Sequence, residues 1–240
     1  MATLYSFFVR SLYKYALIKP GERILLSVSG GIDSLVMAHL FARLRDSSED
    51  SIYLEAIHVV IPEVSLPDES MNRMREYLKE WKIPLTVIEG KVRKESRFGC
   101  YVCSKERRKK MLLHYYEKRF SALAIGHNEE DYIETGLLNL IFHGNLLSLD
   151  IQEYMFDKSV RIIRPMIIVK KKWILNYAKE NNIVVDEHNC PCERSSKRAM
   201  VRELIKDLSL QNRGFRANLK KAIDKWNAHF QEGFVKEKVL

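Results

Sequence analysis

RILLSVSGGIDS, residues 23–34, is the stretch that decides the fold of this 240-residue chain. Its first six residues form a short, mostly apolar run, which is typical of a buried parallel strand. A turn with two glycines follows, and Leu35 to Leu44 has the composition of a helix. A strand that enters a helix through such a turn places the turn at the strand's carboxyl end, where α/β folds bind their ligands.

The rest of the chain repeats this alternation. We predict further strands near 53–60, 85–88, 122–125 and 161–168, helices near 3–17, 70–81, 104–119 and 129–142, and three helical stretches towards the C-terminus. The alternation predicts an α/β fold with a Rossmann-like parallel sheet and helices on both faces. We divide the chain into an N-terminal helix (1–20), an α/β domain (21–190) and a basic helical C-terminal extension (191–240).

Composition excludes several classes of protein. The chain is 46% apolar and 30% charged, which is ordinary for a globular protein. No run is long and apolar enough for a membrane helix. Arg10 and Lys14 interrupt the aromatic stretch from Leu4 to Ile18, so this stretch is not expected to be a secretory signal. We therefore expect a cytoplasmic protein with no membrane partner.

The positive charge lies in the second part of the chain. Residues 1–90 carry 10 Lys and Arg against 12 Asp and Glu, whereas residues 91–240 carry 30 against 19. The overall net charge of +9 therefore comes entirely from the downstream part. Such a division favours a polyanion that docks on one face, although a solvated lysine surface would give the same count.

The turn at residues 29–34 has the chemistry of a phosphate-binding loop. Gly30 and Gly31 let the backbone approach an anion, and the N–H groups of the turn and helix N-terminus supply partial positive charge. Ser29 and Ser34 add hydroxyl donors, and we expect Asp33 to act on Mg²⁺ bound to the phosphates. The pattern is neither the Walker loop nor the dinucleotide-binding fingerprint. A capped helix after a Gly-Gly turn is the alternative interpretation.

A second motif follows the predicted strand 122–125. It begins Gly126-His127-Asn128, and Asp131 and Glu134 come next on one face of the following helix. Such a carboxylate pair usually faces solvent, but a phosphate loop on the same sheet edge favours a role for Asp131 towards Mg²⁺ or substrate. His127 is expected either to orient a phosphate or to cap the helix.

The four cysteines form two close pairs, Cys100 with Cys103 and Cys190 with Cys192. In a reducing compartment, such pairs indicate metal, cluster or redox chemistry. The first pair precedes a basic helix, and a helix N-terminus with nearby cations favours the metal-binding thiolate. Zinc is one interpretation, although a single residue between the late cysteines is shorter than the usual zinc spacing. An iron–sulfur cluster tolerates irregular spacing better, and thioredoxin-like chemistry fits least well.

Taken in order, these motifs resemble one branch of a known family. The Ser29–Ser34 loop resembles the PP-loop of the ATP pyrophosphatases, which cleave ATP between the α and β phosphates and adenylate a substrate carbonyl. The whole set resembles the iron–sulfur-dependent tRNA 2-thiolation enzymes, which make 2-thiocytidine or 2-thiouridine. The other matching motifs are Lys19-Pro-Gly-Glu-Arg23, Cys100-x-x-Cys103, Gly126-His-Asn-x-x-Asp131-x-x-x-Thr135, Ile163-Arg-Pro165 and Cys190-Pro191. The resemblance covers about residues 15–208 and implies the adenine nucleotide α-hydrolase-like fold.

The resemblance assigns roles residue by residue. It places the phosphates of ATP and Mg²⁺ on Ser29, Gly30, Gly31, Asp33 and Ser34, with Gly126 and His127 in the same ATP site. It makes Asp33, Arg107 and Asp131 catalytic, and it assigns a [4Fe-4S] cluster to Cys100, Cys103 and Cys190, with Cys192 as the alternative third ligand. The chain lacks the zinc-finger cysteines of the thiouridine branch, and its late Cys-x-Cys replaces the Cys-x-x-Cys of the thiocytidine branch.

The resemblance also implies an activity. The enzyme would be a transferase that adenylates C2 of a tRNA pyrimidine and replaces the C2 oxygen with sulfur held at the cluster, forming AMP and pyrophosphate. Its partners would be tRNA and a sulfur donor, either a cysteine desulfurase or free sulfide, and a homodimer is a candidate assembly. We expect the tRNA to be held by Lys105, Arg108, Lys109, Lys110, Lys171 and Lys220.

Two other functions compete with this one. A lysidine-synthetase-like tRNA ligase would share the loop and the RNA but would have no use for four cysteines. A non-enzymatic sensor would bind nucleotide and cluster without turnover. A brown colour under anaerobic conditions argues against the ligase, and AMP with pyrophosphate formed in the presence of tRNA argues against the sensor.

Overall fold

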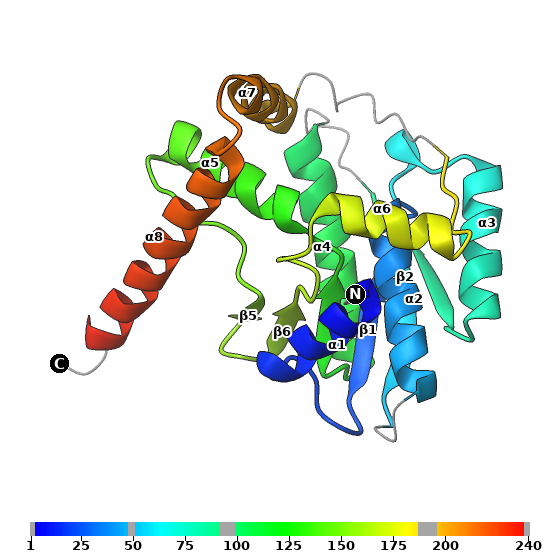
Figure 1. Cartoon of the computed structure of the whole chain (residues 1–240). Coiled ribbons are helices and arrows are strands. Elements are labelled where there is room, and N and C mark those ends of the chain that lie inside the picture. The colour runs from blue at the N-terminus through cyan, green and yellow to red at the C-terminus, as the bar shows by residue number, and fades with distance from the viewer. Residues whose placement is uncertain (1–2, 48–50, 92–98, 187–195, 238–240) are drawn as a thin grey trace. The chain divides into compact units, whose positions relative to one another are not determined.

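The computed structural model describes residues 3–47, 51–91, 99–186 and 196–237 (Figure 1). The chain folds into two compact units. The larger unit comprises Met1–Asn128 and Ile151–Pro191, and the smaller comprises Glu129–Asp150 and Cys192–Leu240. The structure therefore groups residues 1–20 with the α/β domain instead of setting them apart, and it groups residues 129–150 with the C-terminal helices.

The larger unit is built on one six-stranded sheet with the order β3-β2-β1-β4-β6-β5. Its strands are β1 (Arg23–Ser27), β2 (Tyr53–Val60), β3 (Leu85–Glu89), β4 (Ala122–Ile125), β5 (Gln152–Met155) and β6 (Val160–Ile163). All neighbouring pairs are parallel except β5 with β6. The predicted Rossmann-like sheet is thus confirmed, with one antiparallel edge strand that the sequence pattern did not indicate.

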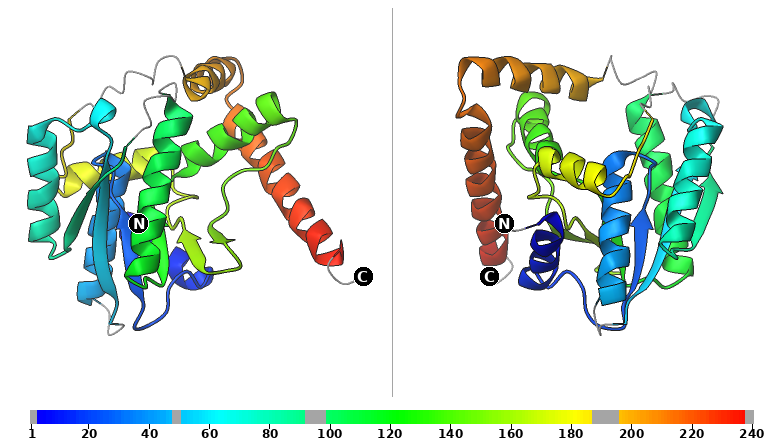
Figure 2. Two further views of the ribbon diagram at one scale, coloured as in Figure 1. Left: turned by 180° about the vertical axis from the view of Figure 1, so that it is seen from behind. Right: turned by 45° about the vertical axis from the view of Figure 1, so that its right-hand side comes forward.

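Helices cover both faces of this sheet (Figures 1 and 2). The helices of the larger unit are α1 (Leu4–Lys14), α2 (Ile32–Ser47), α3 (Asp68–Glu80), α4 (Cys100–Glu117) and α6 (Lys171–Glu180), with a short 3₁₀ helix, η1 (Pro62–Val64). On β1, Ile24 and Leu26 belong to the apolar core that holds α1, α2, α3 and α6. Leu25, between them, belongs to the core under α4. Successive residues of a strand point to opposite faces, so the three central residues of β1 are all apolar because both faces of the sheet are buried there.

The strand predicted over 161–168 is shorter in the structure. β6 ends at Ile163, and the next residues form turns in which Ile167 N–H donates to the Arg164 carbonyl and Val169 N–H donates to the Met166 carbonyl. Pro165 has no N–H to give to a sheet ladder, which explains the end of the strand. Met166, Ile167 and Val169, which follow, are still buried, so their composition reflects the core and not a strand.

The smaller unit consists of α5 (Glu129–His143), α7 (Lys197–Gln211) and α8 (Phe215–Glu237). Gly136 on α5 packs closely against α8, because a Cβ built there would lie 2.5 Å from the Ile223 side chain. Tyr132 on α5 also donates a hydrogen bond to Asp224 of α8 (2.9 Å). These contacts fix α8 on α5 within this unit.

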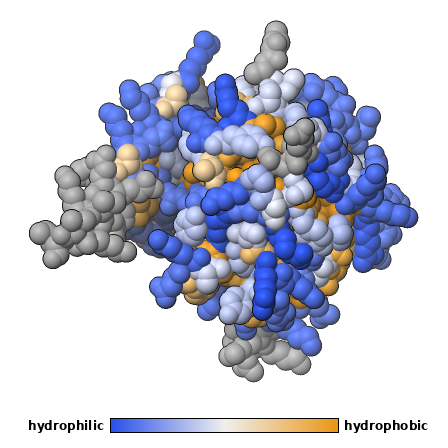
Figure 3. All heavy atoms as spheres, turned by 90° about the horizontal axis from the view of Figure 1, so that it is seen from below, coloured by the Kyte–Doolittle hydropathy of each residue, from blue (hydrophilic) through white to orange (hydrophobic). Residues whose placement is uncertain are grey.

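The exposed surface is mostly polar. Figure 3 shows one face on which hydrophilic side chains predominate and apolar residues form small separate patches. No helix among the described residues is both long enough and apolar enough to cross a membrane.

Candidate active site

The turn at residues 29–34, which we predict to bind phosphate and call the phosphate-binding turn, lies at the switch point of the sheet. β1 pairs with β2 on one side and with β4 on the other, so the chain leaves β1 and β4 in opposite directions. Residues 29–34 follow β1, and Gly126 and His127 follow β4. In doubly wound α/β folds, ligands bind outside the carboxyl ends of the strands at this point. The two motifs therefore meet where the fold class places its ligand.

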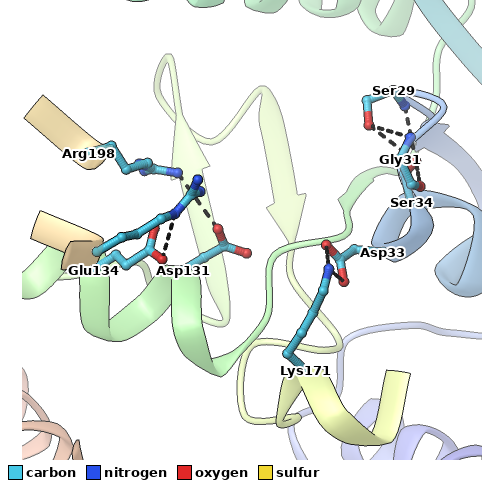
Figure 4. Close-up of polar contacts among 9 residues, drawn as sticks. Ser29, Gly31, Asp33, Ser34, Asp131, Glu134, Lys171 and Arg198 are labelled. Carbon is cyan, nitrogen blue, oxygen red and sulfur yellow. Dashed lines mark hydrogen bonds and ion pairs between the residues drawn. The ribbon is translucent and has the colours of Figure 1, made fainter. Parts of the chain in front are cut away.

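Hydrogen bonds among its own residues close the turn (Figure 4). Ser29 N–H donates to Ser34 Oγ at 3.1 Å, and Gly31 N–H donates to Ser29 Oγ at 3.3 Å. The Ser34 hydroxyl donates to the Gly31 carbonyl at 2.8 Å. The two hydroxyls and the turn amides thus form one compact group of the donors that a phosphate requires.

Two glycines are required by this geometry. Gly30 has φ +88°, and a Cβ there would lie 2.5 Å from Leu66 Cδ1. A Cβ at Gly126 would lie 3.2 Å from the backbone atoms of Asp33 and Ser34. Gly126 therefore lets the end of β4 pack directly against the first turn of α2, beside the phosphate-binding turn.

Asp33 pairs with a lysine from a distant part of the chain (Figure 4). Lys171 Nζ, on the first turn of α6, lies 2.7 and 2.5 Å from the two carboxylate oxygens of Asp33. Both side chains are partly exposed. The sequence pattern assigned Lys171 to the tRNA backbone, and the structure places its ammonium group at the phosphate-binding turn.

Two histidines support the same edge of the sheet. His58, two residues before the end of β2, is buried, and its Nδ1 lies 2.8 Å from the Val28 carbonyl directly before the turn. His127 Nδ1 accepts a hydrogen bond from Arg164 Nε at 3.3 Å, and Arg164 also donates to Glu153 at 2.7 Å. Because Nδ1 of His127 accepts, the neutral ring carries its proton on Nε2 and can donate there.

The early cysteine pair lies on the first turn of α4. Cys100 and Cys103 are three residues apart on this helix, so their side chains share one face. Cys103 packs at the edge of the core under α4, whereas Cys100 is exposed. Arg107 lies one turn further on, and its Nε is buried with no hydrogen-bond partner among the described residues. Cys190 and Cys192 lie outside the described residues.

In the smaller unit, two carboxylates of α5 are paired with arginines of α7 (Figure 4). Asp131 lies 3.7 Å from Arg198, and Glu134 accepts from Arg202 Nε at 2.9 Å. Glu134 is buried, and its second oxygen has no hydrogen-bond partner within the part of the chain that the structure describes. Burial raises the pKa of Glu134, and the neighbouring Arg202 opposes this effect only in part.

The residues expected to bind tRNA are distributed over three helices. On α4, Lys105, Arg108 and Lys109 are exposed and Lys110 is partly exposed. Lys220, on α8, pairs with Asp224 one turn away (2.7 Å).

No local sequence pattern indicated the pairing of Lys171 with Asp33 or the contacts made by His58. Arg164 was part of a matched motif, Ile163-Arg-Pro165, but its contact with His127 depends on the fold.

Comparison with known proteins identifies relatives over most of the chain. The PP-loop domain family model matches residues 4–208. The chain is similar to tRNA-cytidine(32) 2-sulfurtransferase 2 of Francisella tularensis subsp. tularensis, with 28% identity over 86% of this chain and 84% of the relative. It is equally similar, at 28%, to tRNA-cytidine(32) 2-sulfurtransferase 1 of Francisella philomiragia, over 86% of this chain and 82% of that protein.

Solved structures share its fold. The U34-tRNA thiolase NcsA from Methanococcus maripaludis, solved with its [4Fe-4S] cluster, matches with a TM-score of 0.74 and 19% identity. That match covers 93% of this chain and 78% of the thiolase. NMN synthetase from Francisella tularensis matches with a TM-score of 0.50 and 12% identity, over 93% of this chain and 90% of the synthetase.

Proposed function

Because the chain belongs to the PP-loop domain family, we propose that it is an ATP-dependent tRNA sulfurtransferase acting on C2 of a pyrimidine. The observation that carries the proposal is the closed Ser29–Ser34 turn at the switch point, with Asp33 and Gly126 beside it. Relatives named as tRNA-cytidine(32) 2-sulfurtransferases support cytidine as the target. The fold shared with a tRNA thiolase is consistent with the same chemistry.

The reaction has two steps. The C2 oxygen of the pyrimidine attacks the α-phosphorus of ATP, and the bond to the β-phosphate breaks to release pyrophosphate. A sulfur nucleophile from the donor then adds to C2, and the bond between C2 and the adenylated oxygen breaks. AMP leaves with that oxygen and the base keeps the sulfur. Adenylation is needed because a phosphate monoester leaves far more readily than oxide.

The residues of the turn would hold the pyrophosphate part of ATP. Amides of residues 29–31, with the hydroxyls of Ser29 and Ser34, would donate to phosphate oxygens. Asp33 would bind Mg²⁺, and Lys171 would move from Asp33 to the phosphates as the metal arrives. His127 Nε2 would donate to the transferring phosphate. Preorganised donors of this kind stabilise the charge that develops in the transition state.

The thiols present fit an iron–sulfur cluster. Cys100 and Cys103 lie on one face of the first turn of α4, so both can reach one compact group. We propose Cys190 as the third ligand, with Cys192 as the alternative. When bound, the cluster would supply sulfide as the nucleophile, and three cysteine ligands would leave it able to bind that sulfide. Arg107 would face the reacting groups from α4, and Asp131 would supply a catalytic carboxylate from α5.

A reconstitution experiment tests the proposal. The protein, loaded with cluster under anaerobic conditions, is incubated with ATP, Mg²⁺, sulfide, free lysine and total tRNA from a strain that lacks the protein. We expect AMP and pyrophosphate to form only with tRNA, and mass spectrometry of the nucleosides to find a 2-thiopyrimidine. Lysidine in the digest would establish the ligase instead, and tRNA-independent binding of ATP without AMP would establish the sensor.

A further inference from the structure

A groove of about 900 Å³ lies between α4 and the tip of the β5–β6 hairpin, within the larger unit. We name it the α4 groove. Its aromatic side chains are Tyr101 and Tyr116 of α4 and Phe156 of the hairpin tip, and its cations are Lys91, Lys105, Arg108 and Lys109. This volume is in the range of a ligand-binding cleft, and the groove is separate from the phosphate-binding turn.

The groove runs along the outer side of α4 towards the cysteine pair. Gly90, directly after β3, lies next to Glu106, because a Cβ built at Gly90 would be 3.1 Å from Glu106 Cγ. At the other end, the Tyr115 hydroxyl accepts from Arg161 N–H near the start of β6 (3.3 Å). α4 is therefore antiparallel to the parallel strands, and the end of the groove at Tyr101 adjoins Cys100 at the carboxyl edge of the sheet. From Tyr101 to Tyr116 the helix is about 22 Å long.

Three large rings in this groove are exposed to an unusual degree. Tyr101 is 76% exposed, Tyr116 is 71% exposed and Phe156 is 64% exposed. Phe156, Asp157 and Lys158 all have positive φ, near 50–70°. Left-handed backbone at three consecutive residues other than glycine is strained, and strain of this kind concentrates at functional sites. The tip thus holds Phe156 outside the core at an energetic cost.

Charge restricts what can occupy the groove. Its four cations face one carboxylate, Glu106, which itself accepts from Lys91 N–H at 3.4 Å. Lysine is depleted from the centres of protein–protein interfaces. Cations alternating with aromatic rings are instead the composition of surfaces that bind unpaired nucleic acid, where bases stack on the rings and cations follow the backbone.

We infer that the α4 groove binds an unpaired segment of the tRNA, with bases stacked on Tyr101, Tyr116 and Phe156 and phosphates on the neighbouring cations. The inference rests on the proposed function for the identity of the RNA. A groove that carries single-stranded RNA towards the cysteine pair would present an exposed base to the site, and C2 of a paired base is hidden. Base stacking in the groove would also explain why the rings of Tyr101, Tyr116 and Phe156 are exposed to solvent.

The test separates stacking from phosphate contact. Tyr116→Ala and Phe156→Gly remove two rings, and glycine suits the positive φ of residue 156. Tyr101 is left unchanged because it adjoins Cys100. Tyr116→Phe keeps the ring, and Tyr13→Ala removes an exposed tyrosine of α1 outside the groove. Binding of total tRNA from a strain lacking the protein is measured at several salt concentrations, with an unpaired RNA hexamer and a blunt RNA duplex as competitors.

We expect Tyr116→Ala and Phe156→Gly each to weaken tRNA binding by about fivefold or more, with the salt dependence unchanged because every phosphate contact remains. Tyr116→Phe and Tyr13→Ala should bind like the wild type, and only the unpaired hexamer should compete. Unchanged affinity in both ring-removing variants would overturn the inference. Normal tRNA binding with loss of sulfur transfer from a protein persulfide, but not from free sulfide, would assign the groove to a protein donor instead.

Failure of the groove inference is distinguishable from failure of the proposed function. If the wild type forms no thiolated nucleoside and no tRNA-dependent AMP, the sulfurtransferase proposal fails. The binding comparison between the variants and the wild type would still report whether the groove holds unpaired RNA.

Discussion

Lys171 Nζ contacts both carboxylate oxygens of Asp33, at 2.7 and 2.5 Å, across 138 positions of sequence. The pair joins the first turn of α6 to the first turn of α2, beside the phosphate-binding turn. Partly exposed ion pairs of this kind contribute about 1 kcal/mol or less to stability, so breaking this contact in favour of another partner costs little free energy. We propose that, when MgATP enters the site, the carboxylate of Asp33 binds Mg²⁺ and the ammonium group of Lys171 binds the phosphates.

We expect Asp33→Ala to reduce thiolation by roughly 100-fold or more while leaving tRNA affinity nearly unchanged. Positioning of Mg²⁺ and phosphate supplies much of the electrostatic help in nucleotidyl transfer. The measurement is single-turnover AMP formation together with tRNA binding, and circular dichroism checks the fold. Full thiolation by a well-folded Asp33→Ala protein would contradict the assignment of the turn to ATP.

Lys171→Met should raise the KM for ATP by about 10-fold to 100-fold, the effect expected from removing a charge-assisted hydrogen bond to phosphate. Lys172→Met is the matched control, because Lys172 is the exposed next residue of α6. Steady-state AMP formation gives the KM for ATP of both variants. The salt dependence of tRNA binding in the same variants tests the tRNA contact that the sequence pattern assigned to Lys171. An ATP KM that is equal in the two variants would remove Lys171 from the ATP site.

Reversing the charge of Lys109 and Lys110 tests α4 as an electrostatic surface. We expect Lys109→Glu with Lys110→Glu to weaken tRNA binding and to flatten its salt dependence, by about one unit of slope for each phosphate that the variant no longer neutralises. Lys79→Glu with Lys82→Glu, on the far side of the sheet from α4, is the control for net charge. If affinity and slope match the control, α4 is only a solvated face and the tRNA binds elsewhere.

Much of this architecture follows from local sequence signals. β1 and β4 are short apolar runs before glycine turns, and both lie where the pattern predicts them. Thr3 caps α1 by accepting from Ser6 N–H at 3.2 Å, as a helix start of this type predicts. β5 was missed because QEYM is a four-residue edge strand without an alternating apolar pattern, and only its pairing with β6 makes it a strand.

The site is harder to predict from the sequence than the fold is, for a physical reason. The turn carries its own signal, since glycines and hydroxyls are needed at fixed offsets. Contacts that support it, such as Lys171 with Asp33 and Arg164 with His127, join residues that are distant in the chain. A lysine in a basic segment has the same local pattern whether it contacts tRNA or a carboxylate. Only tertiary structure distinguishes these cases.

Glu134 predicts a pH dependence of stability. Burial raises its pKa in the folded protein above the ordinary value, so the folded state holds the proton more tightly than the unfolded state does. The resulting stability is present at acidic pH and is lost as pH rises through the raised pKa. Glu134→Gln stays neutral, so its melting temperature relative to the wild type should rise between pH 4 and pH 7.

Glu203→Gln, an exposed glutamate of α7 with the same charge change, is the control for this measurement. Its melting temperature relative to the wild type should change little over the same range. A relative melting temperature of Glu134→Gln that falls with rising pH would show that the ion pair with Arg202 outweighs burial.

The last prediction concerns the cysteines: three should hold the cluster, and Cys192 should be dispensable. With three cysteine ligands the cluster would still be able to bind sulfide, whereas a fourth thiolate would compete for the same place. Open coordination likewise separates catalytic from structural metal sites. Cys100 and Cys103 already share one helix face, so the late pair should contribute one ligand. A proline ring holds φ near −65°, so we expect Pro191 to hinder Cys190 and Cys192 from both reaching one compact cluster.

Anaerobic reconstitution of the four single Cys→Ser variants tests this prediction through iron content, visible absorption and thiolation. Cys192→Ser should keep a four-iron cluster and activity, whereas Cys100→Ser, Cys103→Ser and Cys190→Ser should lose both. Cys190 is preferred because Cys-Pro matches the ligand of the thiouridine branch that the chain resembles. Loss of the cluster in Cys192→Ser with retention in Cys190→Ser would exchange the two assignments. Bound zinc without iron in the wild type would contradict the cluster assignment. Zinc has no redox chemistry, and four thiolates would close its coordination, which is typical of a structural site.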